Sequence, residues 1–349
     1  MVVTPAYLAL ALQTRCETVN GMSVEAARAR IANSVARIGR QVGAAKALLG
    51  PELKLVVLPE YVLTGFPIRE PTAQWAAMAA IAADGPEIAA LAQVAADNGV
   101  FLALNAYELD PHFAPLHFQT CFLLAPDGTL VMRAHRLISL YTPTPVHVWD
   151  GYLDHYGLAH VLPVASTPIG MLGAIASEEV LYPEIARLLA LRGAEVLLHG
   201  TGEIGSPRAT PKEICRLARA VENSAYLVSA NAAALVSGDV PVATTDGMSK
   251  IVDYRGLVLA EALPGETIGA HAEIDLLALR RHRIRPGMGA MLARVPAQAF
   301  ADLYAVLPAF PLNGLAGSVE AVPDRSGFQA GLAEVIDRLV DQGRLRRPD

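Results

Sequence analysis

The stretch Ile175-Ala-Ser-Glu-Glu-Val-Leu-Tyr-Pro-Glu184 is the most informative part of the sequence. The apolar run Met171–Ala176 predicts a buried strand, and a helix is expected from Pro183 to Arg192. Ser177 stands between the two elements and is followed by two glutamates, which are favourable near a helix N-terminus. The structural interpretation of Ser177 is therefore a polar residue in the turn between a strand and a helix.

Strand-like and helical runs alternate along the rest of the chain in two similar halves, which indicates an α/β fold with helices packed on sheets. In the first half we expect strands at Tyr7–Gln13, Leu55–Leu58, Val100–Ala106, Thr120–Leu124 and Leu130–Arg133, and helices at Val24–Leu49 and Pro86–Asn98. In the second half we expect further strands at Val196–His199, Ala225–Asn231, Ser249–Val252 and Leu257–Ala262, and a helix at Pro211–Asn223.

Glu60 lies in the second informative stretch, Leu55-Val-Val-Leu-Pro-Glu-Tyr-Val-Leu-Thr-Gly-Phe-Pro67. It follows a short apolar strand, and Gly65 lies in the turn beyond. An unpaired carboxylate is costly in an apolar setting, so Glu60 needs hydrogen bonds or a partner. This requirement favours a role in a pocket.

A third informative stretch is His135-Arg-Leu-Ile-Ser-Leu140. Together the three stretches resemble the nitrilase-type carbon–nitrogen hydrolases over roughly residues 5–285. The resemblance implies the four-layer-forming αββα sandwich of that superfamily. It puts Ser177 at the position of the nucleophilic cysteine, Glu60 at the general base and Leu137 at the lysine.

The resemblance also implies that standard catalytic groups are missing. The second glutamate expected in such families falls on Thr144 or Pro145. The four lysines are Lys46, Lys54, Lys212 and Lys250, and none is close in sequence to position 137, so we expect no cation beside Glu60. Serine needs a stronger base than cysteine does, and losing a preorganised cation typically costs about a hundred- to a thousand-fold in turnover.

Two functions are therefore open for the same site. The first is a pseudoenzyme that binds a small molecule or contributes to assembly, with Leu137 non-functional. The second is an atypical hydrolase of small amides, nitriles or esters, in which Ser177 attacks with Glu60 as base.

Ligand contacts are expected from Tyr61, Glu178 and Glu203, the last in the loop 200–208. Glu108 is a further candidate, although a salt bridge in a hairpin explains it equally well. His135, His147 or His199 could approach Ser177 in space.

Composition limits the other classes of function. The chain has 349 residues, a net charge of −6 and 53% hydrophobic residues, which fits a large core and argues against nucleic-acid binding. The apolar run from Tyr7 to Leu12 is too short to span a bilayer, and no membrane role is expected. The thiols of Cys16, Cys121 and Cys215 are far apart in sequence, which favours a cytoplasmic protein with no metal or cofactor.

The sequence predicts a hydrolase-like domain over 1–285 and a C-terminal extension over 286–349. No regular pattern is expected from Pro286 to Ser318, whereas apolar residues at helical spacing predict an amphipathic helix at about 325–343. The resemblance also implies a homodimer or larger assembly through Pro183–Arg192. An active paralogue is a further possible partner.

Overall fold

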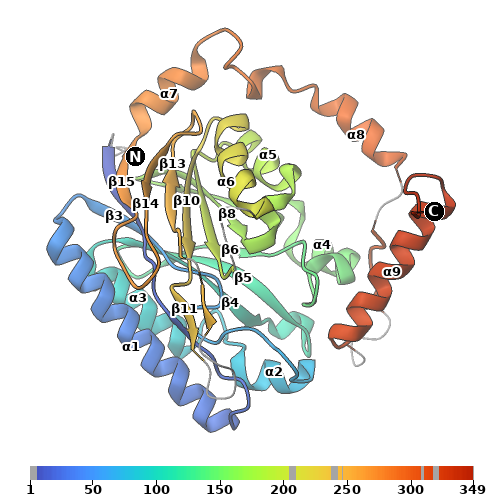
Figure 1. Ribbon diagram of the computed structural model, residues 1–349, viewed down its shortest axis with the longest axis horizontal. Coiled ribbons are helices and arrows are strands. Elements are labelled where there is room, and N and C mark those ends of the chain that lie inside the picture. The colour runs from blue at the N-terminus through green and yellow to red at the C-terminus, as the bar shows by residue number, and fades with distance from the viewer. Residues whose placement is uncertain are drawn as a thin grey trace.

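A computed structural model describes residues 6–203, 210–236, 243–245, 247–307, 310–316 and 322–348 (Figure 1). Two six-stranded sheets form its centre. The first sheet has the order β15 (His271–Asp275), β1 (Ala6–Ala11), β3 (Leu53–Val57), β4 (Phe101–Leu109), β5 (His117–Leu124) and β6 (Leu130–His135). The second has the order β14 (Val258–Glu261), β13 (Lys250–Val252), β10 (Tyr226–Asn231), β9 (Val196–Thr201), β8 (Gly170–Ala176) and β7 (Val164–Thr167).

Three apolar clusters define four layers. The middle cluster lies between the two sheets, and each outer cluster lies between one sheet and its helices. Adjacent residues on a strand face opposite sides: Val56 packs toward the helices of the first sheet, whereas Val57 packs between the sheets. The layers are therefore helices, sheet, sheet and helices, which is the predicted αββα sandwich.

The helices that cover the sheets are those the sequence predicts, with a few additions. The first sheet carries α1 (Val24–Leu49), α2 (Thr72–Ala79) and α3 (Pro86–Asn98), and the second carries α5 (Pro183–Leu191) and α6 (Pro211–Glu222). Outside these layers lie α4 (Trp149–Tyr156) and a small sheet of β12 (Ala243–Thr244), β11 (Ala234–Val236) and β2 (Cys16–Glu17). Short 3-10 turns form at Pro111–Phe113, Pro145–Val148, Leu158–His160, Ser177–Leu181 and Leu292–Arg294.

Helix α1 shows how local sequence fixes an element. The Ser23 hydroxyl accepts a hydrogen bond from the backbone N–H of Ala26 and so caps the first turn. Ile31, Ile38 and Val42 recur at helical spacing and are fully buried against the first sheet. Each such side chain contributes about 1.5–3 kcal/mol through burial. Gly50 ends the helix with a φ of 83°, which suits glycine.

The C-terminal extension leaves the sandwich after α7 (Leu276–Ile284) and runs around its outside as an arc, coloured orange to red in Figure 1. The expectation of no regular pattern from Pro286 to Ser318 is wrong, because α8 (Ala297–Ala305) and the 3-10 turn Leu292–Arg294 form there. None of the residues of α8 is buried, although Ala297, Phe300, Ala301 and Tyr304 recur at helical spacing and line one groove. A helix, α9 (Arg325–Asp341), lies where one is predicted.

Among the helices of the described residues, none combines the length and the apolar character that crossing a bilayer requires.

Candidate active site

Ser177 and Glu60 meet at one end of the two central sheets, where they line a cavity of about 280 Å³. Glu60 follows β3 and Ser177 follows β8, and Gly200 on the neighbouring β9 packs closely against the backbone of residues 58–60. The fold thus brings together Glu60 and Ser177, which are far apart in the chain, because the ends of β3 and β8 lie close to each other on facing sheets.

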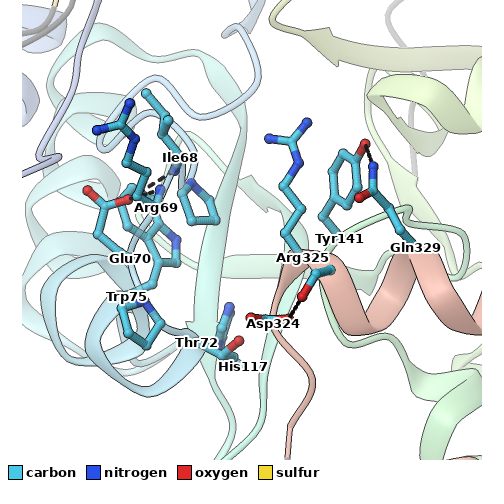
Figure 2. A pocket seen from close by; sticks show the side chains of 13 residues that line it. Ile68, Arg69, Glu70, Thr72, Trp75, His117, Tyr141, Asp324, Arg325 and Gln329 are labelled. Atoms are coloured by element: carbon cyan, nitrogen blue, oxygen red, sulfur yellow. Dashed lines mark hydrogen bonds between the residues drawn. The ribbon is translucent and has the colours of Figure 1, made fainter.

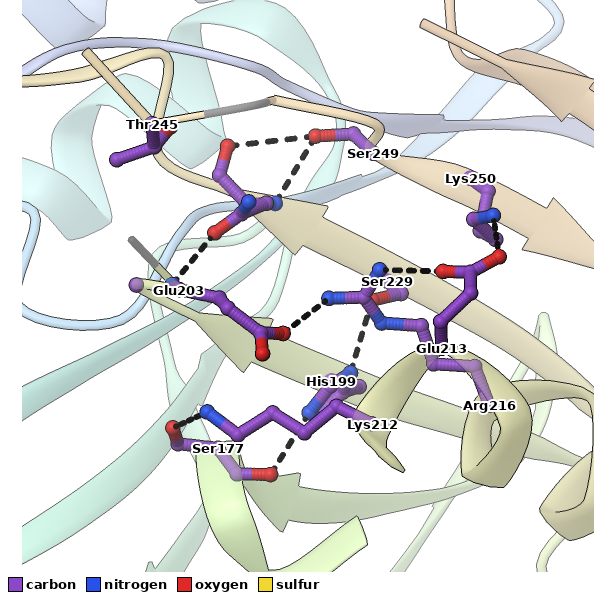
Figure 3. Close-up of polar contacts among 12 residues, drawn as sticks. Ser177, His199, Glu203, Lys212, Glu213, Arg216, Ser229, Thr245, Ser249 and Lys250 are labelled. Atoms are coloured by element: carbon purple, nitrogen blue, oxygen red, sulfur yellow. Dashed lines mark hydrogen bonds and ion pairs between the residues drawn. The ribbon is translucent and has the colours of Figure 1, made fainter. Parts of the chain in front are cut away.

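Ser177 occupies a backbone conformation that is rare for a residue with a side chain. Its φ is 44°, in the left-handed region, and its exposed fraction is only 4%. Such a conformation costs of order 1–3 kcal/mol and persists where the surroundings impose it, often at functional sites. The Ser177 hydroxyl lies 3.3 Å from Lys212 Nζ, which donates to it (Figure 3).

Lys212 corrects the expectation that no lysine reaches this site. It lies in the first turn of α6, 35 residues beyond Ser177 in the chain. The packing of α6 against the turn Ser177–Leu181 brings its ammonium group to the hydroxyl. Sequence distance alone could not find this contact, because it depends on how the helix packs on the second sheet.

Glu60 is also not without a cation. Arg136 Nη1 lies 3.2 Å from Glu60 Oε1, and both side chains are almost completely buried. Gln119 Nε2 donates to the same oxygen at 2.7 Å, and the backbone N–H of Gly202 donates to Oε2 at 3.1 Å. Three donors therefore hold the carboxylate, and the expectation of an uncompensated Glu60 is wrong.

Arg136 supplies Glu60 with the cation that the resemblance implied at position 137. Its guanidinium also pairs with Glu178 and donates to the carbonyl of Ile138 at 2.6 Å. The side chain of Leu137 instead packs against the apolar cluster beneath α5 and α6. Arg136 thus faces Glu60 while Leu137 faces the apolar cluster, so the cation is one residue earlier in the chain than the resemblance implies.

Tyr61, which is an expected ligand contact, lines the cavity and is hydrogen-bonded to Gln119. The Tyr61 hydroxyl donates to Gln119 Oε1 at 3.3 Å, and its ring stacks on Tyr107 with centroids 5.3 Å apart. Burial raises the pKa of Tyr61 well above its ordinary value, so the phenol keeps its proton. Like Ser177, Tyr61 has a positive φ, of 55°.

Of the other expected ligand contacts, Glu178 lines the cavity, whereas Glu108 and Glu203 do not. Glu178 lines the cavity, where it pairs with Arg136 and accepts the backbone N–H of Leu140 at 3.1 Å. Glu108 is not among the cavity-lining residues. Its buried carboxylate lies 2.6 Å from Arg133 Nε and 3.2 Å from His135 Nε2, which favours the salt-bridge interpretation.

Glu203 also lies away from the cavity, in a buried charge network that Figure 3 shows. Its carboxylate is 3.7 Å from Arg216, which pairs in turn with Glu213. Glu213 and Glu261 both pair with the fully buried Lys250. This network secures α6 against the second sheet. Residues 204–209 of the loop that contains Glu203 fall outside the described residues.

Comparison with known proteins places these observations in a family. A family model described as carbon-nitrogen hydrolase matches residues 9–283, most of the chain. The chain belongs to the carbon-nitrogen hydrolase family. It is 27% identical to a probable nitrilase of Schizosaccharomyces pombe over 63% of this chain and 74% of the relative. It is also 27% identical to a formamidase of Bradyrhizobium diazoefficiens, over 75% and 72% of the respective chains.

Solved structures agree on the fold. Saccharomyces cerevisiae Nit3, a member of branch 10 of the nitrilase superfamily, aligns with a TM-score of 0.61 and 19% identity over 81% of this chain and 95% of its own. A carbon-nitrogen hydrolase of Helicobacter pylori aligns with a TM-score of 0.63 and 20% identity over 86% and 98%. At this identity the likeness establishes the αββα fold alone.

The histidines of this family member do not form a serine–histidine pair in the described structure. His199 approaches Ser177, but its Nε2 lies 3.0 Å from the backbone carbonyl and its Nδ1 is 2.8 Å from the Ser229 hydroxyl. Burial lowers the pKa of His199 well below 6.5, so the ring is neutral. His135 pairs with Glu108, and His147 contacts Thr144.

No cysteine replaces Ser177 in the described site. Burial raises the pKa of both Cys16 and Cys121 to about 12, so neither thiol is ionised at neutral pH. Cys215 is half-buried on α6 and packs against the apolar cluster beneath that helix. Within the described residues, no group of three or more His, Cys, Asp or Glu side chains is arranged to hold a metal ion.

Proposed function

We propose that this carbon-nitrogen hydrolase family protein binds a small molecule in the Ser177 cavity without performing the cysteine chemistry of its family. The observation that carries the proposal is the hydrogen bonding around Ser177 and Glu60. Three donors occupy the Glu60 carboxylate, and the ring of His199 bonds the Ser177 carbonyl and the Ser229 hydroxyl. Glu60 thus serves as a fixed partner of Arg136 in this arrangement, and removing a proton from serine would require a stronger base.

The nature of the nucleophile supports the same conclusion. A cysteine thiol ionises near pH 8.5 in peptides, and an alkyl hydroxyl is a far weaker acid. Serine hydrolases overcome this difference with a positioned base, usually a histidine. The only histidine that contacts Ser177 within the described residues bonds its backbone carbonyl.

A second candidate is an atypical serine hydrolase, and the contact with Lys212 favours it. Ser177 Oγ would form a bond to the carbon of an activated amide or ester while its proton passes to Glu60. The Lys212 ammonium would stabilise the negative charge on the substrate oxygen. The leaving group would then take the proton from Glu60, and water would hydrolyse the acyl-serine ester to release the acid.

Intact-protein mass spectrometry separates the two candidates. The wild-type protein, Ser177→Ala, Ser177→Cys and a surface control, Ser166→Ala, are incubated with a panel of small amides, nitriles and esters. We expect no adduct on the wild type and covalent adducts on Ser177→Cys. The strained turn at position 177 and the Glu60 carboxylate are retained, and a thiol is the nucleophile that suits them. Wild-type adducts that persist in Ser166→Ala and disappear in Ser177→Ala would establish the serine hydrolase instead.

We further propose self-association through α5. Leu188 and Leu191 on this helix are exposed, and they line a largely apolar groove of about 480 Å³ together with Phe300 of α8. Tyr304 Oη donates to Glu184 at 2.5 Å, which holds α8 beside α5. Sedimentation velocity of the full chain tests this proposal, and a monomer at micromolar concentration would contradict it.

A further inference from the structure

The Ser177 cavity carries an excess of positive charge. Three cationic side chains line it, Arg136, Lys212 and Arg325, against the two carboxylates of Glu60 and Glu178. Both carboxylates are already paired with Arg136. In the part of the chain that the structure describes, neither Lys212 nor Arg325 forms an ion pair with any carboxylate. The side chains that line the cavity therefore carry one positive charge in excess, and both Lys212 and Arg325 can meet an anionic ligand.

Arg325 lies where this cavity meets a larger one. It begins α9, and with Tyr141 and Pro67 it lines both the Ser177 cavity and an adjoining cavity of about 450 Å³. Figure 2 shows its side chain extended beside Tyr141 and across from the segment Ile68–Glu70. The guanidinium lies 4.0 Å from the centre of the Tyr141 ring. Gln329, one turn further along α9, donates to the Tyr141 hydroxyl at 3.3 Å.

The carboxylates of the outer cavity are committed to other partners. Asp324 caps α9, since its Oδ1 accepts from the Ser326 hydroxyl and the backbone N–H of Gly327. Glu70 accepts from the Asn20 side chain and from backbone N–H groups, including that of Ile68. These bonds explain why Arg325 stacks on an aromatic ring and leaves its N–H donors available to a ligand.

We propose that the cavity selects a small molecule with a carboxylate at one end and a carbon–nitrogen group at the other. Arg325 binds the carboxylate at the junction of the two cavities, and the carbon–nitrogen group lies over Ser177 and Lys212. Guanidinium and carboxylate match in geometry and form short, charge-assisted hydrogen bonds. Arg325 is thus a specificity-determining residue, supplied by the C-terminal extension. This inference rests on the proposed function, namely that the cavity takes a ligand.

Isothermal titration calorimetry with the full chain tests the selection through two probes of nearly equal shape. Succinamate carries one carboxylate and one amide, whereas succinamide carries two amides and no charge. Wild type is expected to bind succinamate about tenfold more tightly, because a hydrogen bond to a charged group is stronger than one to a neutral amide. The preference should shrink at high salt. Arg325→Gln should abolish most of it, while Arg338→Gln, a control on the same helix that lines neither cavity, should keep it.

The outcomes separate this inference from the proposed function. Equal binding of both probes to the wild type would overturn the anion selection and leave ligand binding intact. A preference that survives in Arg325→Gln would also overturn it, because another group would then hold the carboxylate. Binding of neither probe would overturn the inference, and it would count against the proposed function as well if the wider panel of neutral amides, nitriles and esters also failed to bind.

Discussion

Replacing Arg136 by methionine should destabilise the protein strongly, because it removes the cation from the buried carboxylate of Glu60 and from the partly exposed carboxylate of Glu178. The Arg136 side chain is 3% exposed and that of Glu60 is 4% exposed. Methionine retains much of the apolar stem but none of the donors to Glu60, Gln119, Glu178 or the carbonyl of Ile138. Breaking a buried ion pair by removing one partner typically costs about 3–5 kcal/mol.

A double-mutant cycle separates the interaction energy of the Arg136–Glu60 pair from the other contributions of Arg136 to stability. Glu60→Gln removes the negative charge and keeps a side chain of the same shape, so the double variant Arg136→Met, Glu60→Gln contains neither member of the pair. We expect Arg136→Met to lower the free energy of unfolding by about 3 kcal/mol. The double variant should lose about 2 kcal/mol less than the sum of the single changes, as is typical of residues in direct contact.

Urea unfolding monitored through the fluorescence of the buried Trp75 provides the assay. An exposed ion pair serves as the control: Arg347 lies 2.6 Å from Asp337, and their side chains are 70% and 58% exposed, so Arg347→Met should leave the urea midpoint nearly unchanged. Strictly additive losses in the Arg136 and Glu60 cycle would refute the view that this ion pair organises the site.

Two further predictions concern acid stability and the neighbouring leucine. Burial lowers the pKa of His117 from 6.5 to about 4, so the unfolded chain binds a proton that the folded chain does not in that interval. Stability should be fully present above pH 6.5 and fall as the pH drops toward 4, by up to about 3 kcal/mol for this group. Urea midpoints measured across this range should fall less steeply for His117→Gln, and an unchanged slope would contradict the assignment. Leu137→Lys should lower stability by about 1 kcal/mol, because it puts an ammonium into the apolar cluster beneath α5 and α6. It should give no gain of adducts by mass spectrometry in a Ser177→Cys background, and a gain would show that this lysine reaches Glu60.

The sequence was sufficient for the layers of the fold and for the two ends of the site. Periodicity placed α1 and α3 at the bounds that the structure has, because their buried faces and their ends are encoded locally. Ser177 and Glu60 were assigned because the stretches that contain them resemble the nucleophile and general-base motifs of the family. Helix α8 was not predicted, because it lies in a segment rich in Pro and Gly, although Ala297, Phe300, Ala301 and Tyr304 recur at helical spacing.

The partners of these two residues could not be read from the sequence, because they arise from tertiary packing. Lys212 reaches Ser177 only through the placement of α6, and Gln119 reaches Glu60 across neighbouring strands of the first sheet. The resemblance also pointed to a lysine as the only cation of the site. Arginine at position 136 meets the same electrostatic need with a longer and branched side chain.

A single buried carboxylate explains why Arg136 and Leu137 point in opposite directions. Glu179 accepts the backbone N–H groups of Leu137 at 2.7 Å and Ile138 at 3.2 Å through one oxygen, and that of Ala176 at 3.0 Å through the other. It thereby ties the segment after β6 to the turn that holds Ser177. Backbone contacts of this kind do not depend on the side chain at position 177. The strained conformation of Ser177 is consequently maintained by its surroundings, and an exchange of serine for cysteine should alter the chemistry of the site while leaving its geometry in place.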